Sequence, residues 1–410
     1  MILKFFVRNY KSIVEEEIDF NFAEGKAPNG YQESDYFTFL SSRKGRCIPV
    51  LAIFGANGSG KSNILESINQ LISILQDGYV FGRYYPNRLN MKYDTTIFRM
   101  QFIVNDNLYV YNIEYDSKEI KEEYLKRNNK FLLKTNGLKV ESNILNDDKL
   151  SSVNQVFKNS CLDQSIFKNS LLTMCKKWLS GLNADISIAY NYLVSLVYTK
   201  TNNIPTFVSI DVLSGNQPQG LDKSFREIVS VLQKMDINVT NAKMNFQREL
   251  IKSVQYPNGN KISNWQDKIT VYRSDTKGSE VEFKLNEESM GTRLLFGMLG
   301  VILLVLKEGR ILFADELDRS LHPFILRELT RLFKDKSINV NNAQLIYSAH
   351  DTSILEDELL RISEAAFVTN TVIEGTKIKR LCDYNGISNA DNFRKLYINC
   401  RLGAVPATTN

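Results

Sequence analysis

The stretch Gly55-Ala-Asn-Gly-Ser-Gly-Lys-Ser62 constrains this chain more than any other. It has the form G-x-x-x-x-G-K-[S/T], in which glycines let the backbone fold around phosphates and amide N–H groups point inward. An apolar run at residues 48–54 precedes it, and residues 63–75 repeat apolar side chains at helical spacing. The order strand, loop, helix predicts a phosphate site at the N-terminus of a helix.

Two side chains of this stretch have roles set by the chemistry of a phosphate chain. Lys61 is placed to reach the β- and γ-phosphates, and the hydroxyl of Ser62 is placed to ligate Mg²⁺. We therefore expect the chain to bind ATP or GTP. The residues expected to line this site are Gly55, Ala56, Asn57, Gly58, Ser59, Gly60, Lys61, Ser62 and Asn63.

Length and composition limit what the rest of the chain can be. Its 410 residues exceed one typical domain, so we expect one large domain with an insertion, or two domains. Hydrophobic residues make up 43% of the chain and charged residues 24%, which is typical of a soluble globular protein. A net charge of +5 is too weak to indicate nucleic-acid binding by itself.

The compartment is predicted from the cysteines and the apolar segments. Five cysteines without metal-binding spacing indicate reduced thiols in a cytoplasmic protein. The first residues do not have the pattern of a signal peptide. The longest apolar stretch, residues 294–306, is shorter than the ~20 residues that span a bilayer, so we expect no membrane association.

Around the phosphate site, alternating apolar residues predict antiparallel strands. Residues 3–7 and 16–22 form one expected pair, residues 96–104 and 108–115 a hairpin, and residues 268–273 and 280–285 another. Residues 23–46 are polar and Gly-rich and are expected to form a loop.

Residues 116–266 differ from their surroundings. They are rich in Lys and Asn, with helical periodicity at 160–182 and 221–235, which predicts a mostly helical insertion. A solvated helical face is favoured for its basic side chains over a nucleic-acid or partner surface. These basic residues are Lys176, Lys177, Lys234, Lys243, Arg248 and Lys252.

The second half carries a pair of acids at the end of an apolar run. Residues 309–316 have the Walker B form, in which Asp315 holds Mg²⁺, directly or through water, and Glu316 orients the attacking water. Adjacent acids at the end of a buried strand are costly unless a cation or hydrogen bonds meet them, and Mg²⁺ would supply that partner.

The chain contains two histidines, and both lie near these acids. For His322, a structural role and a functional role are equally favoured. His350 follows another apolar strand, at residues 343–347, within Ser348-Ala-His-Asp351. We expect its side chain to contact the γ-phosphate or the attacking water.

Five motifs in this order resemble a family. Besides the phosphate loop, they are Glu288-Ser-Met-Gly-Thr-Arg293, Ala314-Asp-Glu-Leu-Asp-Arg-Ser-Leu-His-Pro323, Ser348-Ala-His-Asp351 and the ending Tyr397-Ile-Asn-Cys-Arg-Leu-Gly-Ala-Val-Pro406. The chain resembles the ABC-type ATPases of bacterial phage-defence and abortive-infection operons. These include the ATPase components of PARIS-like and Septu-like systems and the ATPase half of overcoming-lysogenization-defect nucleases.

The resemblance implies an α/β fold, with a central mostly parallel sheet, an antiparallel β lobe and an inserted mainly helical domain. Residues 1–115 and 267–410 would be the two halves of the ATPase domain, and residues 116–266 the insertion. It further implies a head-to-tail homodimer, or a higher homo-oligomer, with two ATP molecules between protomers.

In that arrangement Ser289 and Gly291 form the signature motif, which would contact the γ-phosphate bound by the other protomer. Residues 318–322 resemble the loop that crosses the interface. Two features depart from the usual pattern. The signature reads Met-Gly-Thr where Ser-Gly-Gly-Gln is usual, and neither Gln101 nor Gln155 is a convincing Q-loop glutamine.

Three function classes follow. The first is a defence ATPase that acts as sensor and scaffold for a separate nuclease or toxin, with DNA or a phage protein as trigger. The second is a DNA-maintenance ATPase of the RecF or SMC-like kind, although residues 116–266 are too short and unpatterned for long coiled-coil arms. The third is a self-contained nuclease. It is disfavoured because the sequence shows no second cluster of acids and leaves too few residues after His350 for an appended nuclease domain. The motif pattern favours the first class, and argues against a transporter ATPase. Partner contact is expected at residues 116–266 and 392–406.

Overall fold

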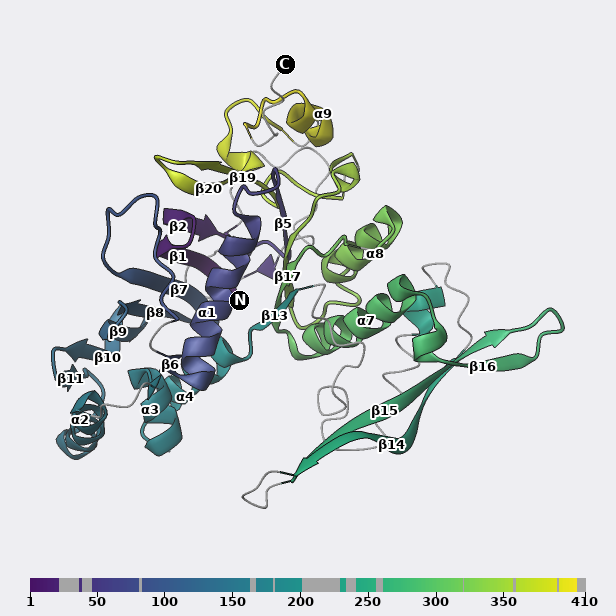
Figure 1. Cartoon of the computed structure of the whole chain (residues 1–410). Coiled ribbons are helices and arrows are strands. Elements are labelled where there is room, and N and C mark those ends of the chain that lie inside the picture. Colours follow the sequence, from purple (N-terminus) through teal and green to yellow (C-terminus); the bar gives the residue numbers. More distant parts are fainter. Residues whose placement is uncertain are drawn as a thin grey trace.

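The computed structural model describes residues 1–21, 37–38, 46–80, 83–162, 167–179, 181–200, 229–233, 241–255, 261–319, 321–356, 359–388 and 391–403. Within these residues, thirteen strands form one sheet in the order β11-β10-β9-β8-β7-β1-β2-β20-β19-β5-β18-β17-β13 (Figure 1). The predicted loop at residues 23–46 and the predicted helix at 221–235 lie largely outside the described residues.

One half of the sheet is parallel and holds the phosphate loop. Its strands pair in parallel from β13 through β17, β18 and β5 to β19. Their bounds are β13 Val197–Lys200, β17 Ile311–Asp315, β18 Gln344–Ser348, β5 Val50–Phe54 and β19 Ala365–Thr371. Every residue of β5, β17 and β18 is buried, as expected for parallel strands covered on both faces.

Alternate side chains of β5 enter two different cores. Leu51 and Ile53 pack in the cluster that contains the apolar face of α1 (Lys61–Asp77). Val50, Ala52 and Phe54 pack in the cluster that contains α7 (Met290–Glu308) and α8 (Pro323–Lys334). Because side chains alternate along a strand, this division places α1 on one face of the sheet and α7 and α8 on the other.

The other half of the sheet is antiparallel and forms a lobe. The predicted pairs at residues 3–7 with 16–22 and 96–104 with 108–115 are confirmed as β1 with β2 and β7 with β8. The lobe strands are β1 Ile2–Tyr10, β2 Ile13–Asp19, β7 Thr96–Val104, β8 Asn107–Tyr115, β9 Ile120–Arg127, β10 Lys130–Asn136, β11 Lys139–Glu141 and β20 Gly375–Arg380.

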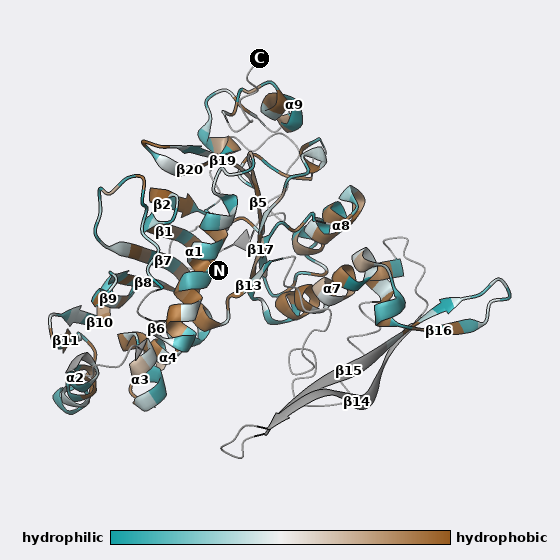
Figure 2. Ribbon diagram, in the orientation of Figure 1, coloured by the Kyte–Doolittle hydropathy of each residue, from teal (hydrophilic) through white to brown (hydrophobic). Residues whose placement is uncertain are grey.

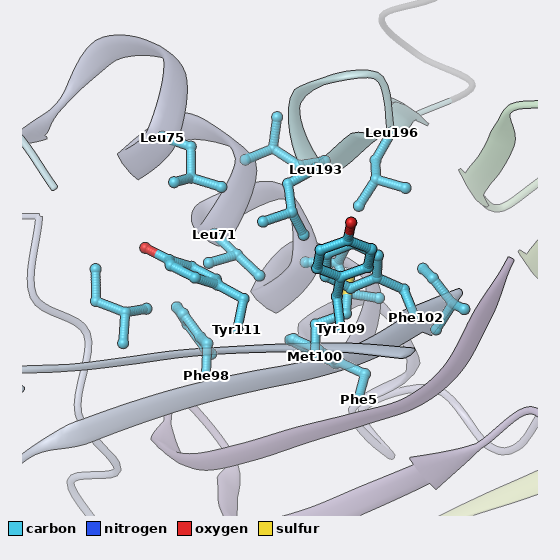
Figure 3. Packing of buried hydrophobic residues seen from close by; sticks show 14 of the residues in the cluster. Phe5, Leu71, Leu75, Phe98, Met100, Phe102, Tyr109, Tyr111, Leu193 and Leu196 are labelled. Carbon is cyan, nitrogen blue, oxygen red and sulfur yellow. The ribbon is translucent and has the colours of Figure 1, made fainter. Parts of the chain in front are cut away.

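Aromatic and aliphatic side chains fix this lobe to the helices above it. Figure 3 shows Phe98, Met100, Phe102, Tyr109 and Tyr111 rising from the strands toward side chains of α1 and of the chain around α4 (Ala184–Val194). Phe98, Met100, Phe102 and Tyr111 are fully buried. At about 25 cal/mol per Å², such aromatic burial is a main stabilising contribution to the lobe.

Residues 116–266 are not mainly helical over their described part. Their beginning forms β9, β10 and β11, which extend the antiparallel lobe, and their end forms β14 (Asn241–Gln255) and the first part of β15 (Lys261–Ser274). In the described part, the helical residues are those of α2 (Asp147–Leu162), α3 (Leu171–Trp178) and α4, together with residues 229–233 inside the helix predicted at 221–235. The predicted helix at 160–182 is therefore two helices, and β13 returns the chain to the parallel half. The overall fold class is confirmed, while the three proposed segment boundaries stay a prediction.

A second sheet extends away from the first (Figure 1). It consists of β14, β15 and β16 (Glu280–Lys284), paired antiparallel in that order. The hairpin predicted at residues 268–273 and 280–285 is thus confirmed as the β15–β16 pair. Shorter elements complete the described chain: β3 Phe37–Thr38, β4 Arg46–Cys47, β6 Tyr79–Val80, β12 Phe167–Lys168, α9 Phe393–Ile398 and the 3-10 turns η3 Leu285–Glu287, η4 Ser353–Leu355 and η5 Leu381–Asp383.

The apolar segment predicted at residues 294–306 lies within α7, which Figure 2 shows as largely hydrophobic. Among the described helices, α7 is the one long and apolar enough to cross a membrane, but 56% of its most apolar window is buried inside the protein. Its side chains Leu295, Leu299 and Ile302 are fully buried against the sheet cluster. This burial is typical of a core helix.

Candidate nucleotide site

The phosphate loop leaves β5 and enters α1 through a turn that requires glycine. Gly55, Gly58 and Gly60 all have positive φ, and Gly60 is the N-cap of α1 at φ 103°. A Cβ on Gly60 would lie 2.1 Å from Thr376 Oγ1, and one on Gly55 would lie 2.6 Å from the Val368 carbonyl oxygen. The lobe strand β20 and the parallel strand β19 therefore hold the loop from outside.

Lys61 folds back over the loop. Its Nζ donates to the carbonyl oxygens of Gly55 at 2.6 Å and Ala56 at 3.2 Å. Burial lowers the pKa of Lys61, and the charges of Asp315, Asp318 and Glu316 oppose that shift. A phosphate oxygen could replace either carbonyl as the acceptor, as the predicted role requires.

The two predicted metal ligands meet beside the loop. Ser62 Oγ donates to Asp315 Oδ1 at 3.1 Å, and Ser348 Oγ donates to the same oxygen at 2.7 Å. Asp315 is 0% exposed, so these hydroxyls help to satisfy a buried carboxylate. Ser348 also accepts the N–H of Glu316 at 2.7 Å, which fixes the acidic pair to the end of β18.

Glu316 sits in a left-handed conformation, with φ 55°. Arg319 donates to its Oε2 at 3.0 Å, and His350 Nε2 lies 3.9 Å from its Oε1. The backbone around His350 is fixed by Asp318, whose Oδ2 accepts the N–H groups of His350 and Asp351, each at 2.7 Å. Asp318, expected to act across an interface, thus also orders the histidine loop of its own chain.

The phosphate loop, Glu316 and His350 line one cavity of about 630 Å³, whereas Asp315 is buried behind Ser62 and does not line it. Its lining brings together the phosphate loop, Glu316 and His350, as the sequence predicts. The lining residues are Ala56, Asn57, Gly58, Ser59, Gly60, Lys61, Ser62, Asn63, Glu316 and His350. Gly55 lies at the base of the loop, where its carbonyl accepts from Lys61.

Ser289 and Gly291 do not line this cavity. Ser289 is the exposed N-cap of α7, and its Oγ accepts the N–H of Thr292 at 3.1 Å. Glu288, the preceding residue, is buried and ion-paired with Arg273 of β15. The signature motif is therefore anchored to the second sheet rather than to the phosphate loop.

Other candidates take structural positions. His322 is the N-cap of α8, and its Nδ1 accepts the N–H of Phe324 at 3.2 Å, which favours the structural role. Gln101 lies in β7 and Gln155 in α2, and neither lines the cavity.

Sequence reasoning missed three side chains around the site. The Ser12 hydroxyl accepts a hydrogen bond from Asn63 Nδ2 at 2.6 Å and lies 2.6 Å from Thr376 Oγ1. Thr376 Oγ1 in turn donates to the carbonyl oxygen of Ser59 at 3.2 Å. Lys200, at the end of β13, places its Nζ 3.3 Å from Asp315 Oδ2. These contacts depend on strand pairing far along the chain, so no local sequence pattern marks them.

The oxygens of Ser62 and Asp315 fit Mg²⁺. The ion binds hard oxygen ligands, and in phosphate sites it uses one or two protein oxygens together with phosphates and water. Ser62 Oγ and Asp315 Oδ1 are such oxygens, held 3.1 Å apart next to the loop that would carry the phosphates.

The family of the chain is given by its match to protein-family models. Residues 50–170 and 208–356 match the family described as "AAA domain, putative AbiEii toxin, Type IV TA system". The matched segments cover more than half of the chain and include the phosphate loop, Ser289, Asp315 and His350. The chain belongs to this family. It is thus a P-loop protein with an AAA domain, whereas no curated protein sequence matches it.

Solved structures of SMC head domains also align with this family member. The SMC head domain from Thermotoga maritima has 17% identity and a TM-score of 0.45, over 92% of this chain and 98% of that one. An SMC head domain with an extended coiled coil bound to the C-terminal domain of ScpA, derived from Pyrococcus furiosus, has 12% identity and a TM-score of 0.45, over 98% and 99%. At these identities and scores, the alignments say nothing about function.

Proposed function

We propose that the chain binds ATP with Mg²⁺ in this cavity and hydrolyses it to ADP and phosphate. The observation that carries the proposal is the shared lining: the phosphate loop, Glu316 and His350 face one space of about 630 Å³. Mg²⁺ held by Ser62 and Asp315 would neutralise charge that develops on the phosphates.

Different residues of the site bind the phosphates and position the attacking water. Lys61 exchanges its carbonyl acceptors for phosphate oxygens, and the loop N–H groups bind the remaining phosphate charge. Glu316 orients the attacking water, because its carboxylate reaches the cavity from the end of β17. His350 lies nearest Oε1 of Glu316, whereas Arg319 pairs with Oε2, and His350 contacts the γ-phosphate or that water.

We further propose a homodimer in which each cavity is completed by the partner. Ser289 and Gly291 are exposed or half-exposed at the start of α7, outside their own cavity. A second copy of the chain would bring them to the γ-phosphate.

The biological role that we propose is anti-phage defence in the cytoplasm. The family description names a toxin of a toxin–antitoxin system, which supports a role in bacterial self-limitation. The ATPase would act as a sensor and scaffold that holds, and then releases or activates, a separate nuclease or toxin. DNA or a phage protein would be the trigger. The alternative is a RecF- or SMC-like DNA-maintenance ATPase.

The first experiment tests the chemistry. Wild-type protein and Lys61→Ala are compared for binding of a fluorescent ATP analogue and for phosphate release with Mg²⁺. Lys121→Ala is the matched control, because Lys121 is an exposed lysine paired with Asp116 and Glu119 on the lobe. We expect Lys61→Ala to lose nucleotide binding and Lys121→Ala to behave as wild type. Equal binding by all three proteins would contradict the assignment.

The second experiment tests the role. The gene is expressed with its genomic neighbours, and cells are challenged with phage, with Lys61→Ala as the inactive variant. The purified chain is also incubated alone with plasmid, single-stranded DNA and tRNA in Mg²⁺ or Mn²⁺ with ATP. We expect protection that needs Lys61, and no cleavage by the chain alone. DNA-stimulated hydrolysis without any protection would favour DNA maintenance, and cleavage lost in an acidic variant outside Asp315 and Glu316 would indicate a self-contained nuclease.

A further inference from the structure

Lys200 joins the metal-binding carboxylate to a second group of charges. It is the last residue of β13, and the sheet register pairs it with Asp315 of β17. Its Nζ lies 3.3 Å from Asp315 Oδ2 and 3.8 Å from Glu66 Oε1. Glu66, on α1, is also ion-paired with Lys11 in the β1–β2 turn. Four side chains of alternating charge therefore run from the nucleotide site to the antiparallel lobe.

The two oxygens of Asp315 face different partners. Oδ1 accepts the hydroxyls of Ser62 and Ser348, whereas Oδ2 lies toward Lys200. The lysine side chain is 29% exposed and the carboxylate is fully buried, so the pair interacts with little solvent screening on the side of Asp315. Ser62 and Ser348 already orient Oδ1, and the ammonium is not required for that orientation.

Next to Lys200 the chain forms a small cavity of about 280 Å³. Lys200 and Glu66 both line it, together with Lys11 and three tyrosines, Tyr10, Tyr85 and Tyr198. The ammonium of Lys200 therefore has space and a second carboxylate on the side away from Asp315.

We propose that Lys200 sets the metal affinity of the site by competing with Mg²⁺ for the charge of Asp315. This inference rests on the proposed function. Mg²⁺ held by Ser62 and Asp315 would place two positive charges on the same carboxylate that the Lys200 ammonium contacts. Like charges that share one carboxylate repel by more than thermal energy. The metal therefore displaces the ammonium toward Glu66. The Lys200 side chain at the end of β13 thus changes position when metal and nucleotide bind, and its ammonium then pairs with Glu66.

The test measures metal affinity rather than turnover. Mn²⁺ is titrated into protein saturated with a non-hydrolysable ATP analogue, and bound Mn²⁺ is followed by electron paramagnetic resonance. Lys200→Met keeps the length of the side chain and removes its charge, so we expect Mn²⁺ to bind on the order of tenfold more tightly. Lys200→Arg keeps the charge and is expected to stay near the wild-type affinity. Lys121→Met is the control for loss of an exposed lysine elsewhere.

Glu66 is tested in a double-mutant cycle. Glu66→Gln removes the second carboxylate, so the ammonium stays with Asp315 and Mn²⁺ should bind several-fold more weakly. In the Lys200→Met background the same change should have a smaller effect, because no ammonium remains to be displaced. An equal effect in both backgrounds would show that Glu66 acts on the metal directly, which overturns its role as acceptor.

The outcomes separate this inference from the proposed function. If wild-type protein binds no Mn²⁺ with the analogue, or Lys61→Ala binds it equally, the proposed function fails and this inference fails with it. If wild-type protein binds Mn²⁺ and the analogue but Lys200→Met has unchanged or weaker Mn²⁺ affinity, competition between Lys200 and the metal is overturned. The proposed function then stands. Thermal unfolding of each variant shows whether any change follows from misfolding.

Discussion

The phosphate loop and the signature motif of this chain are built in opposite ways. In the phosphate-loop half, Lys61 and Asp315 are buried at 6% and 0% exposure, and both form hydrogen bonds within the same chain. In the signature half, Ser289 is exposed and the adjoining Met290 is 63% exposed. The first half is preorganised inside the protomer, and the second presents its residues to the outside.

In the proposed homodimer, this difference would explain why one chain carries both motifs but needs a second copy to complete a site. The phosphate loop lies against β19 and β20, where Val368 leaves no room for a side chain on Gly55 and Thr376 donates to the carbonyl of Ser59. The signature begins α7 and is held by the pair of Glu288 with Arg273 in the second sheet. We infer that nucleotide binds first to the preorganised half, and that the exposed half supplies a contact only on assembly.

The largest expected effect lies in the preorganised half. Glu316→Gln removes the carboxylate that we propose orients the attacking water, and it keeps the shape of the side chain, so hydrolysis should fall about 10²–10⁴-fold while nucleotide binding persists. Phosphate release and binding of a fluorescent ATP analogue measure the two properties separately. Hydrolysis at the wild-type rate would show that another residue orients the water.

The next effect tests the exposed half. Gly291→Arg places a bulky charge on the signature motif, and we expect hydrolysis to fall at least about 10²-fold, as for loss of a transition-state contact. Because Gly291 is helical and does not have positive φ, the protomer should still fold. Unchanged thermal unfolding and nucleotide binding would verify that.

Mixing that variant with Lys61→Ala sharpens the comparison. A heterodimer would join the intact phosphate loop of one chain to the intact signature of the other. Random exchange should then recover about a quarter of wild-type hydrolysis, if the two sites of a symmetric dimer act independently. Mixtures that exchange subunits and recover nothing would argue for a site completed within one chain.

Sequence alone predicted the preorganised half well, because its parts are local. Glycines before Lys61 and acids after an apolar strand are readable without knowing the fold, and parallel strands then bring their ends together. The contact of Lys200 with Asp315 could not be predicted in this way, because it follows from the pairing of β13 with β17.

The outer strands of the lobe, β9, β10 and β11, were missed for a related reason. β9 reads Ile-Lys-Glu-Glu-Tyr-Leu-Lys-Arg, and a buried position is taken by the acid Glu123. Glu123 accepts the N–H groups of Leu171 and Leu172 at the start of α3, and burial raises its pKa to about 7. A charged residue in the core interrupts the apolar alternation by which a strand is predicted.

A smaller effect is expected from the hydroxyl that links Asp315 to Glu316. Ser348→Ala removes a donor to Asp315 and the acceptor of the Glu316 N–H. The free energy of unfolding should therefore fall by about 1–3 kcal/mol. Hydrolysis should fall about tenfold, because the Glu316 backbone loses its anchor. Thr330→Val is the control, since Thr330 is a buried hydroxyl of α8 outside the cavity. It should lower stability without lowering the hydrolysis rate per folded molecule.

The smallest effect is expected from a comparison of two serines that both cap helices. Ser289 and Ser170 are N-caps, of α7 and α3, and each accepts the N–H three residues ahead, at 3.1 and 3.0 Å. Replacing either with alanine should cost about 1 kcal/mol of folding stability, measured by chemical denaturation. Only Ser289→Ala should also lower hydrolysis, because only Ser289 faces outward where a second protomer can use it. If both variants lose equal stability and neither loses activity, the serine of the signature is a helix cap alone, and the trans contact must come from Gly291 and its neighbours.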